Sequence, residues 1–489
     1  MRSYLDQTIL LLIFSAVSGA LSKLEFEYHT NEQMEEILKR FETIGNTKLT
    51  TRLYSIGISS SFQKPFPLWV LEITAAPENR TGVPNVKLLG NMHGNEAGGR
   101  EILLHFIENL ITLYDKDSRV TWLLKNTRLH IMPTLNPDGF SEASNSCHGS
   151  MGREVPSFMV DLNRNFPDFF HPNPELVHAE ETIAVMNWMD KTKFILSAAL
   201  HEGDMVANYP YDAINPNGFG AYLTPDDDVF KYLARVYADN HPVMHASKGC
   251  SNAGKDFKNG ITNGADWYQF DGGMGDYNYN FHGCMEVTLE LSCCKYPSNL
   301  TKLWSENEKS LLMYCMQANM GVTGLILDGT TRKPVEEEAM LRIEGRKLYF
   351  RSFQKTGEFW RILLPGKYIL RVEVPGYYTH YENFTVEQPV NGFPKLTNLT
   401  ILLVNASFPT TTTTTTTSST TPTTTIRSKP SVAANLTARF GQNDGEKTDN
   451  VTWNEQVPIL AASTSKSSRD LLLSELFLLI FITTFYLLL

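Results

Sequence analysis

Two side chains with metal-binding chemistry, His93 and Glu96, lie three positions apart in the Gly-rich stretch HGNEAGG. The stretch follows a short apolar run, residues 86–89, that is typical of a buried strand. Imidazole nitrogen and carboxylate oxygen together suit Zn²⁺, and a catalytic zinc site keeps one position open for water. A surface loop produces the same His-x-x-Glu pattern by chance, so the pattern indicates a zinc site only if the chain supplies the other parts.

The third metal ligand is predicted at His201, which follows the apolar run 194–200. In open α/β sheets the ligand crevice lies outside the carboxyl ends of the strands, so the three side chains would meet at one edge of the sheet. The chain has 12 histidines. Two of the others, His105 and His130, lie inside an expected helix and an expected strand, and we interpret them as structural.

A carboxylate, Glu290, lies among the apolar residues of VTLEL, residues 287–291. A buried carboxylate without a partner is costly, so Glu290 should be paired, protonated or functional. Structural hydrogen bonding is the alternative to catalysis. Glu286, four residues earlier, would lie on the same strand face, so strand alternation does not choose between the two carboxylates.

The elements that must position these groups follow from the spacing of apolar residues. Spacings of three and four predict helices at residues 31–44 and 99–114. Short apolar runs predict strands at residues 53–58, 68–74, 86–89, 128–133, 194–200 and 287–291. Strands that alternate with helices predict an α/β domain with a mostly parallel sheet covered on both faces.

A different pattern begins near Gly321, where short alternating segments are separated by Gly/Pro turns. This pattern predicts a small all-β sandwich. Residues 410–425 are almost entirely threonine and serine, a composition typical of an O-glycosylated stalk. Asn-x-Ser/Thr sequons are consistent with a secreted glycoprotein and stand at Asn79, Asn299, Asn383, Asn398, Asn405, Asn435 and Asn450.

Both ends of the chain have the composition of targeting segments. Arg2 precedes an apolar run, residues 9–17, and small residues that suit cleavage after Ala20, which predicts a secretory signal peptide. Residues 471–489 are mostly apolar and follow small residues and a polar spacer, which predicts a glycolipid (GPI) attachment signal. A terminal membrane helix is the alternative, and both interpretations put the protein at the outer face of the plasma membrane.

The length of 489 residues predicts two or three folded domains. We expect a signal peptide at 1–20, a catalytic domain at 21–320, a β-sandwich at 321–405, a glycosylated stalk at 406–470 and the hydrophobic tail at 471–489. The net charge of -10 and the lack of a Lys/Arg-rich block argue against a nucleic-acid partner.

The six cysteines are Cys147, Cys250, Cys284, Cys293, Cys294 and Cys315. In an oxidising compartment their even number permits complete pairing, with 15 connectivities open. The adjacent Cys293 and Cys294 must reach different partners if both form disulfides. Zinc ligation by cysteine is the rival interpretation, but the sequence contains no C-x-x-C pair.

Several separated motifs, taken in order, resemble the zinc metallocarboxypeptidases of the N/E (regulatory) subfamily over residues 25–403. The motifs are HGNE (93–96), NPDGF (136–140), DLNRNFPD (161–168), ANYPYD (207–212), DYNY (276–279) and TLELSCCKYP (288–297), with GEFWRILLPGKY (357–368) in the sandwich. The resemblance implies a mixed eight-stranded sheet flanked by helices, followed by a transthyretin-like β-sandwich.

Position by position, the resemblance also implies a role for each candidate residue. It implies one zinc ion per chain, held by His93, Glu96 and His201, and it implies that Glu290 rather than Glu286 is the general base. The substrate contacts that it implies are Arg153 on the scissile carbonyl, Asn163 and Arg164 on the terminal carboxylate, Tyr268 closing over the bound residue, and Asp212 holding a C-terminal Lys or Arg.

The expected protein is therefore a monomeric, zinc-dependent exopeptidase of the cell surface that removes C-terminal Lys or Arg from peptides and proteins. The alternative is a catalytically silent, GPI-anchored binding or adhesion protein on the same scaffold. The chain departs from the family pattern at two positions, with Gly275 where the family usually has Gln and Glu202 where it usually has Gly. Neither departure removes a catalytic group, but an added carboxylate at Glu202 could favour basic substrates or perturb the metal.

Overall fold

The computed structural model describes residues 23–61, 64–147, 160–246, 249–250, 256–354 and 356–407. Expected features outside these residues are Arg153, the signal peptide, nearly all of the stalk with Asn435 and Asn450, and the hydrophobic tail. Within the described ranges, no helix is both long enough and apolar enough to cross a membrane.

The first part of the chain forms a mixed sheet of eight strands in the order β1-β2-β4-β3-β5-β8-β6-β7. Its strands are β1 (Thr50–Ile58), β2 (Pro67–Thr74), β3 (Asn85–Gly90), β4 (Arg128–Met132), β5 (Phe194–His201), β6 (Met205–Tyr209), β7 (Ile261–Asn263) and β8 (Met285–Leu291). The central pairs β4–β3, β3–β5 and β5–β8 are parallel, whereas β1–β2, β2–β4 and β8–β6 are antiparallel. The expected mixed eight-stranded sheet is confirmed.

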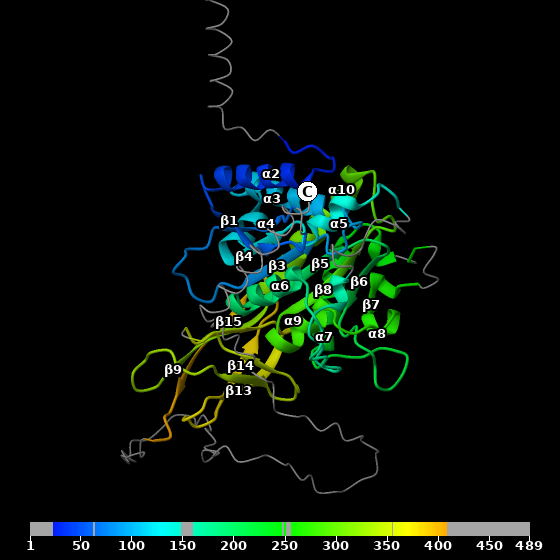
Figure 1. Cartoon of the computed structure of the whole chain (residues 1–489). Helices are drawn as coiled ribbons and strands as arrows, with labels where there is room; N and C mark the ends of the chain where they lie inside the picture. Colours follow the sequence, from blue (N-terminus) through cyan, green and yellow to red (C-terminus); the bar gives the residue numbers. More distant parts are fainter. Residues whose placement is uncertain are drawn as a thin grey trace, which may run out of the picture. The chain divides into compact units, whose positions relative to one another are not determined.

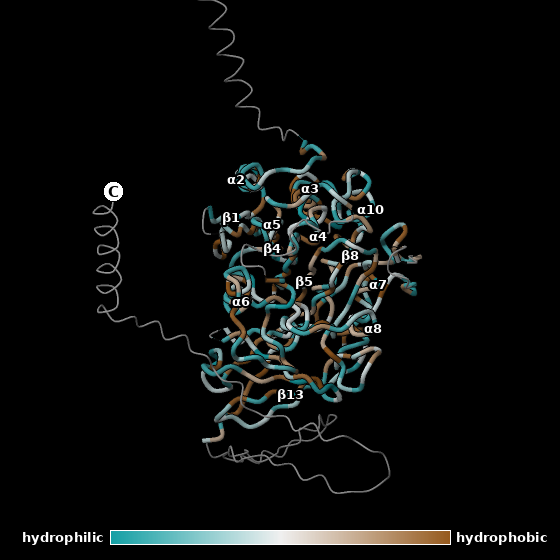
Figure 2. Tube along the Cα trace, turned by 45° about the vertical axis from the view of Figure 1, so that its right-hand side comes forward, coloured by the Kyte–Doolittle hydropathy of each residue, from teal (hydrophilic) through white to brown (hydrophobic). Residues whose placement is uncertain are grey.

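Helices cover both faces of this sheet (Figure 1). One face packs against α2 (Asn31–Gly45), α3 (Gly98–Leu113), α4 (Ser118–Asn126), α7 (Asp227–Asn240) and α10 (Leu300–Met316). The other face packs against α6 (Glu180–Lys191) and α9 (Met274–His282), and the short helices α5 (Pro137–Glu142) and α8 (Gly264–Trp267) lie in connecting segments. Every residue of β5 is buried, and Figure 2 shows hydrophobic residues along these inner strands in brown.

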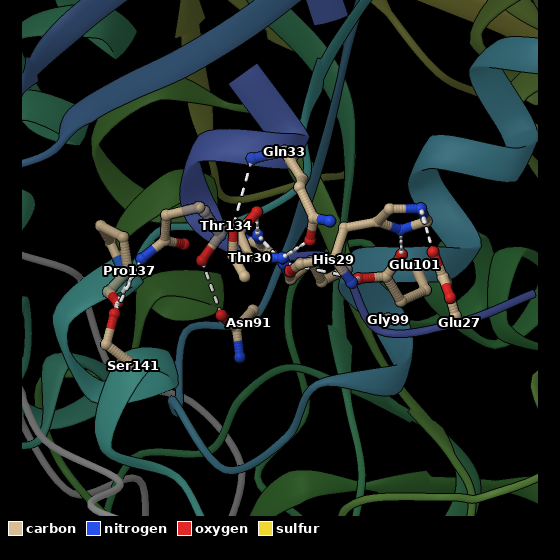
Figure 3. A network of polar contacts seen from close by, with 12 residues as sticks. Glu27, His29, Thr30, Gln33, Asn91, Gly99, Glu101, Thr134, Pro137 and Ser141 are labelled. Atoms are coloured by element: carbon tan, nitrogen blue, oxygen red, sulfur yellow. Dashed lines mark hydrogen bonds and ion pairs between the residues drawn. The ribbon is translucent and has the colours of Figure 1, made fainter. Parts of the chain in front are cut away.

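The first of these helices, α2, begins at a capping box. The Thr30 side chain accepts a hydrogen bond from the backbone N–H of Gln33, and the Gln33 side chain accepts one from the backbone N–H of Thr30 (Figure 3). The pair satisfies two backbone donors that a helix start leaves free. Met34, Leu38 and Phe41 lie on the buried face of the helix, as their spacing predicts.

The second part of the chain is the predicted all-β sandwich. A four-stranded sheet in the order β11-β10-β13-β14 packs against a three-stranded sheet in the order β12-β9-β15. The strands are β9 (Gly321–Asp328), β10 (Met340–Ile343), β11 (Tyr349–Arg351), β12 (Glu358–Arg361), β13 (Gly366–Glu373), β14 (His380–Val386) and β15 (Leu396–Leu403). The β15–β9 pair is parallel and the other pairs are antiparallel.

A buried ion cluster joins the sandwich to the α/β sheet. Arg361, on β12, donates to the carboxylate of Asp226, directly before α7. Arg346 and Tyr279 donate to the same carboxylate at 2.7 and 2.6 Å. Asp226 and Tyr279 are fully buried, and Arg361 is 4% exposed. Because removing one member would leave a buried charge unpaired, this cluster fixes the sandwich against α7 and α9.

Two disulfides, Cys147–Cys294 and Cys250–Cys293, lie in the α/β part of the chain. The adjacent cysteines therefore reach different partners, as predicted. Cys284 and Cys315 are buried free thiols, so the pairing is not complete.

Candidate metal centre and substrate cavity

His93, Glu96 and His201 converge on one point, as their positions at strand ends predict. Each offers a ligand atom, and these atoms lie within 4.8 Å of one another. His93 Nδ1 lies 3.0 Å from Glu96 Oε1, and His201 Nδ1 lies 2.8 Å from Glu96 Oε2. His105 and His130 lie in α3 and β4, away from this cluster, where His105 stacks on Phe26 and His130 contacts Tyr54.

The loop between β3 and α3, which carries His93 and Glu96, is held by Asn91. Its φ of 53° is a left-handed conformation that Asn adopts more readily than most residues. The Asn91 amide Nδ2 donates to the carbonyl oxygens of His93, Gly94 and Glu96, each at 3.0 Å. Its Oδ1 accepts from the Thr134 hydroxyl at 2.6 Å (Figure 3). Asn91 therefore ties the whole loop to the neighbouring strand end.

The strands β5 and β8 bring His201 beside Glu290. They are parallel neighbours, and His201 lies opposite Glu290 in their register. Both residues line a cavity of about 260 Å³ together with His93 and Glu96. Glu286 does not line this cavity, because it lies deeper on the same strand, where its Oε2 accepts from Ser197 and Asn278. The structure thus separates two carboxylates that strand alternation leaves equivalent.

Two further charged side chains surround the cluster. Asp161 Oδ1 lies 3.1 Å from His93 Nε2, and Lys295 Nζ lies 3.2 Å from Glu96 Oε1. A carboxylate on the far nitrogen of a metal-binding histidine fixes its tautomer and raises its basicity. Neither contact could be predicted from the sequence; Asp161 opens the DLNRNFPD motif, which is the one local signal that could have indicated its contact with His93.

Burial and the neighbouring carboxylates act in opposite directions on the pKa of the His93 imidazole. Burial alone would lower the pKa of His93, but the negative charges of Glu96 and Asp161 raise it to about 10. Burial would raise the pKa of Glu96, but the two histidines hold it well below its usual range. The cluster therefore stabilises positive charge at its centre.

This donor set fits zinc. Two imidazoles and one carboxylate are a three-ligand set of catalytic zinc sites, whose fourth position takes water or substrate. The Nδ1 atoms of His93 and His201 both face the Glu96 carboxylate, while the far nitrogen of His93 is bonded to Asp161. His201 Nε2 is buried and has no hydrogen-bond partner among the described residues.

Glu290 is 8% exposed, and its buried Oε2 has no hydrogen-bond partner in the described part of the chain. Burial first, and then the negative charge of Glu96, raise the pKa of Glu290 well above its ordinary value. A carboxylate with a raised pKa suits proton transfer near neutral pH.

The polar wall of the cavity carries Asn163, Arg164 and Tyr268. The Arg164 guanidinium carbon lies 3.5 Å from the ring centroid of Phe270. Asn163 Oδ1 accepts from the backbone N–H of Met274 at 3.1 Å, which leaves the amide NH₂ as a donor. Tyr268 is 46% exposed. A guanidinium with an adjacent amide donor can bind a carboxylate through several hydrogen bonds.

Asp212 lines the same cavity, on the segment after β6. Asn208 donates to its Oδ1 at 2.8 Å, and Asp276 of α9 accepts from its backbone N–H at 3.0 Å. A Cβ added at Gly264 would lie 1.7 Å from Asp212 Oδ1, so only glycine fits beside this carboxylate. Burial raises the pKa of Asp212, against the hydrogen bond from Asn208 and the charge of Arg164.

Comparison with known proteins agrees with this geometry. The family described as zinc carboxypeptidase matches residues 41–310, more than half of the chain. This chain belongs to the zinc carboxypeptidase family. Carboxypeptidase M of Mus musculus is 42% identical over 387 residues, which cover 77% of this chain and 85% of that protein. Carboxypeptidase D of Mus musculus is 40% identical over 368 residues, which cover 74% of this chain and 26% of that protein.

Among solved structures, carboxypeptidase A from Helicoverpa armigera aligns with a TM-score of 0.48 and 16% identity, over 65% of this chain and 80% of that chain.

As a zinc carboxypeptidase, the protein is a metalloprotease that acts on peptides. Its fold brings every predicted site residue that the structure describes to one cavity, and Arg153 lies outside the described residues. Of the two departures from the family pattern, Glu202 lines the cavity and accepts a hydrogen bond from the backbone N–H of Gly99. The other, Gly275, lies in α9, where an added Cβ would be 3.9 Å from Asp212 Oδ2.

Proposed function

We propose that this zinc carboxypeptidase removes C-terminal Lys or Arg from peptides and proteins, using His93, Glu96 and His201 as zinc ligands and Glu290 as general base. One observation carries the proposal: a single cavity is lined by the metal-binding cluster, by Glu290 and by the buried carboxylate of Asp212. The metal-binding cluster and Glu290 are the groups that hydrolysis of a peptide bond requires. The Asp212 carboxylate is an anionic partner for a basic side chain.

The terminal carboxylate of the peptide would bind Arg164 and Asn163. Arg164 presents parallel N–H donors that match the two oxygens of a carboxylate, and Phe270 supports the plane of its guanidinium. Asn163 adds an amide donor, because its oxygen is already bonded to Met274. Binding of the chain end selects the last peptide bond, which makes the enzyme an exopeptidase. Tyr268, beside them, would cover the bound residue.

Bound zinc lowers the pKa of a water molecule and polarises a carbonyl oxygen. Glu290 accepts a proton from the attacking water on its carboxylate and returns it to the leaving amine. Arg153 is proposed to stabilise the carbonyl oxygen.

The surface location rests on the predicted signal peptide and GPI signal. Disulfides in the fold and exposed sequons at Asn383 and Asn398 support an oxidising, glycosylating compartment. A monomer anchored by its lipid and without a nucleic-acid partner is the form that we propose.

Peptides that differ only in their last residue test the proposal. Release of C-terminal Arg or Lys should stop with a chelator and return with zinc. Asp212→Ala should lower kcat/KM on Arg- and Lys-ended peptides far more than on apolar-ended ones, whereas Asp190→Ala, an exposed carboxylate of α6, should change neither. Zinc-loaded protein that releases no terminal residue would favour the silent binding protein, and an equal loss on both peptide classes would refute the role of Asp212.

A further inference from the structure

The face of β8 that carries Glu290 continues below the cavity. Side chains alternate along a strand, so Glu290, Thr288 and Glu286 share one face while Val287 and Leu289 belong to the opposite core. Glu290 and Thr288 line the cavity. Glu286 lies about 13 Å along the strand from Glu290, at about 3.3 Å per residue. This face therefore continues from the hydrolytic end of the cavity to the buried Glu286 beneath its lining.

Glu286 has one saturated oxygen and one without a partner. Its Oε2 accepts from Ser197 at 2.5 Å and from Asn278 at 2.8 Å, and it lies 3.6 Å from Lys87 Nζ. Its Oε1 is buried and has no hydrogen-bond partner among the described residues. The residue is 1% exposed. Buried polar atoms are almost always hydrogen-bonded, so an acceptor of this kind is open to a donor from water or from a ligand.

Gly275 separates this oxygen from Asp212. A Cβ added at Gly275 would lie 3.8 Å from Glu286 Oε1 and 3.9 Å from Asp212 Oδ2. Its third neighbour is the Pro210 ring, at 3.8 Å. Two carboxylate oxygens thus face one point where the chain places no side chain.

We propose that Glu286, which lies beneath the lining of the cavity, is a second acceptor for the bound side chain, and that the guanidinium of a C-terminal arginine enters the gap beside Gly275 and donates to both Asp212 Oδ2 and Glu286 Oε1. This inference rests on the proposed function. A guanidinium carries five N–H donors on a planar fork and can serve two acceptors on different edges. A lysine ammonium is a compact charge on a flexible stem. The pocket therefore prefers Arg to Lys.

The test compares kcat/KM on three peptides that end in Arg, Lys or Leu. The variants are Gly275→Gln, which fills the gap, and Glu286→Gln, which keeps the shape. In Glu286→Gln the amide oxygen takes the place of Oε2, where Ser197 and Asn278 donate, so the NH₂ group faces the guanidinium in place of an acceptor. Gly275→Ala is the intermediate variant, because its methyl group fills only part of the gap and makes only ordinary contacts.

The wild-type enzyme should prefer Arg to Lys, and both Gln variants should lower the Arg/Lys ratio about tenfold or more, as expected for losing a hydrogen bond to a charged group. Gly275→Ala should lower the ratio less. An unchanged ratio in folded Gly275→Gln would overturn the role of Glu286, even if Glu286→Gln does not fold. A wild-type enzyme that cleaves Leu-ended peptides as well as basic ones would instead refute the proposed function itself.

Discussion

Glu202 Oε1 accepts a 2.5 Å hydrogen bond from the backbone N–H of Gly99, in the first turn of α3. Ala97, the residue before this helix, has no side chain that could cap it. Glu202, the residue directly after β5, therefore supplies the acceptor that a helix start requires. The added carboxylate at this position therefore supports the loop that carries His93 and Glu96, since α3 begins at Gly98, two residues after Glu96.

Replacing Glu202 by Ala should lower the free energy of unfolding by roughly 1 kcal/mol, the usual cost of a lost helix cap. Glu202→Gln keeps an acceptor oxygen and should lose less. Urea unfolding of the three proteins measures the difference. If Ala and Gln variants are equally stable, the hydrogen bond to Gly99 contributes nothing to the fold.

Glu290→Gln should lower kcat by about 10² to 10⁴, the usual contribution of a general base, because an amide cannot accept the proton. Zinc content should stay at one ion per chain, since Glu290 is not a proposed ligand. Steady-state kinetics together with metal analysis checks both statements. Activity within tenfold of wild type would remove Glu290 from the mechanism, and loss of zinc would make it part of the metal site.

The preference for basic ends should decrease as the pH falls. Burial raises the pKa of Asp212, so this carboxylate is neutralised at a higher pH than an ordinary Asp. It is charged above that pKa, where it attracts a cation, and neutral below it. The ratio of kcat/KM on Arg-ended and apolar-ended peptides isolates this effect, because titration of Glu290 affects both substrates. In Asp212→Asn the ratio should be low and independent of pH; a wild-type ratio that is flat with pH would contradict the assignment.

Arg361→Met should lower the free energy of unfolding by about 3–5 kcal/mol, because it leaves Asp226 buried with fewer charged partners. Arg351→Met is the control. Arg351 pairs with Glu338 on the surface and is 49% exposed, so its loss should cost at most about 1 kcal/mol. Equal effects in urea unfolding would mean that the Asp226 cluster does not hold the sandwich.

The convergence of His93, Glu96 and His201 could be predicted because they stand at strand ends, where topology alone brings side chains together. Strand alternation could not separate Glu290 from Glu286, because both side chains lie on the same face of β8. Their different positions along the strand separate them, since only Glu290 lines the cavity. Asn91, Asp161 and Lys295 were not predicted, because their contacts depend on how loops meet in three dimensions. The short strands β6 and β7 were missed for a similar reason, since neither forms a long apolar run.

The disulfide pattern also depended on the fold. Six cysteines allow 15 connectivities. The structure pairs Cys293 and Cys294 with partners 43 and 147 residues away, and no local spacing could have indicated those distances.

The two thiols that remain, Cys284 and Cys315, provide a simple measure of correct oxidation. Both are fully enclosed, and burial raises their pKa, so neither is a reactive thiolate in the native protein. A thiol-labelling reagent should therefore find no site on a correctly oxidised preparation and two after unfolding in denaturant. Any other count identifies a scrambled or incompletely oxidised batch before its activity is measured.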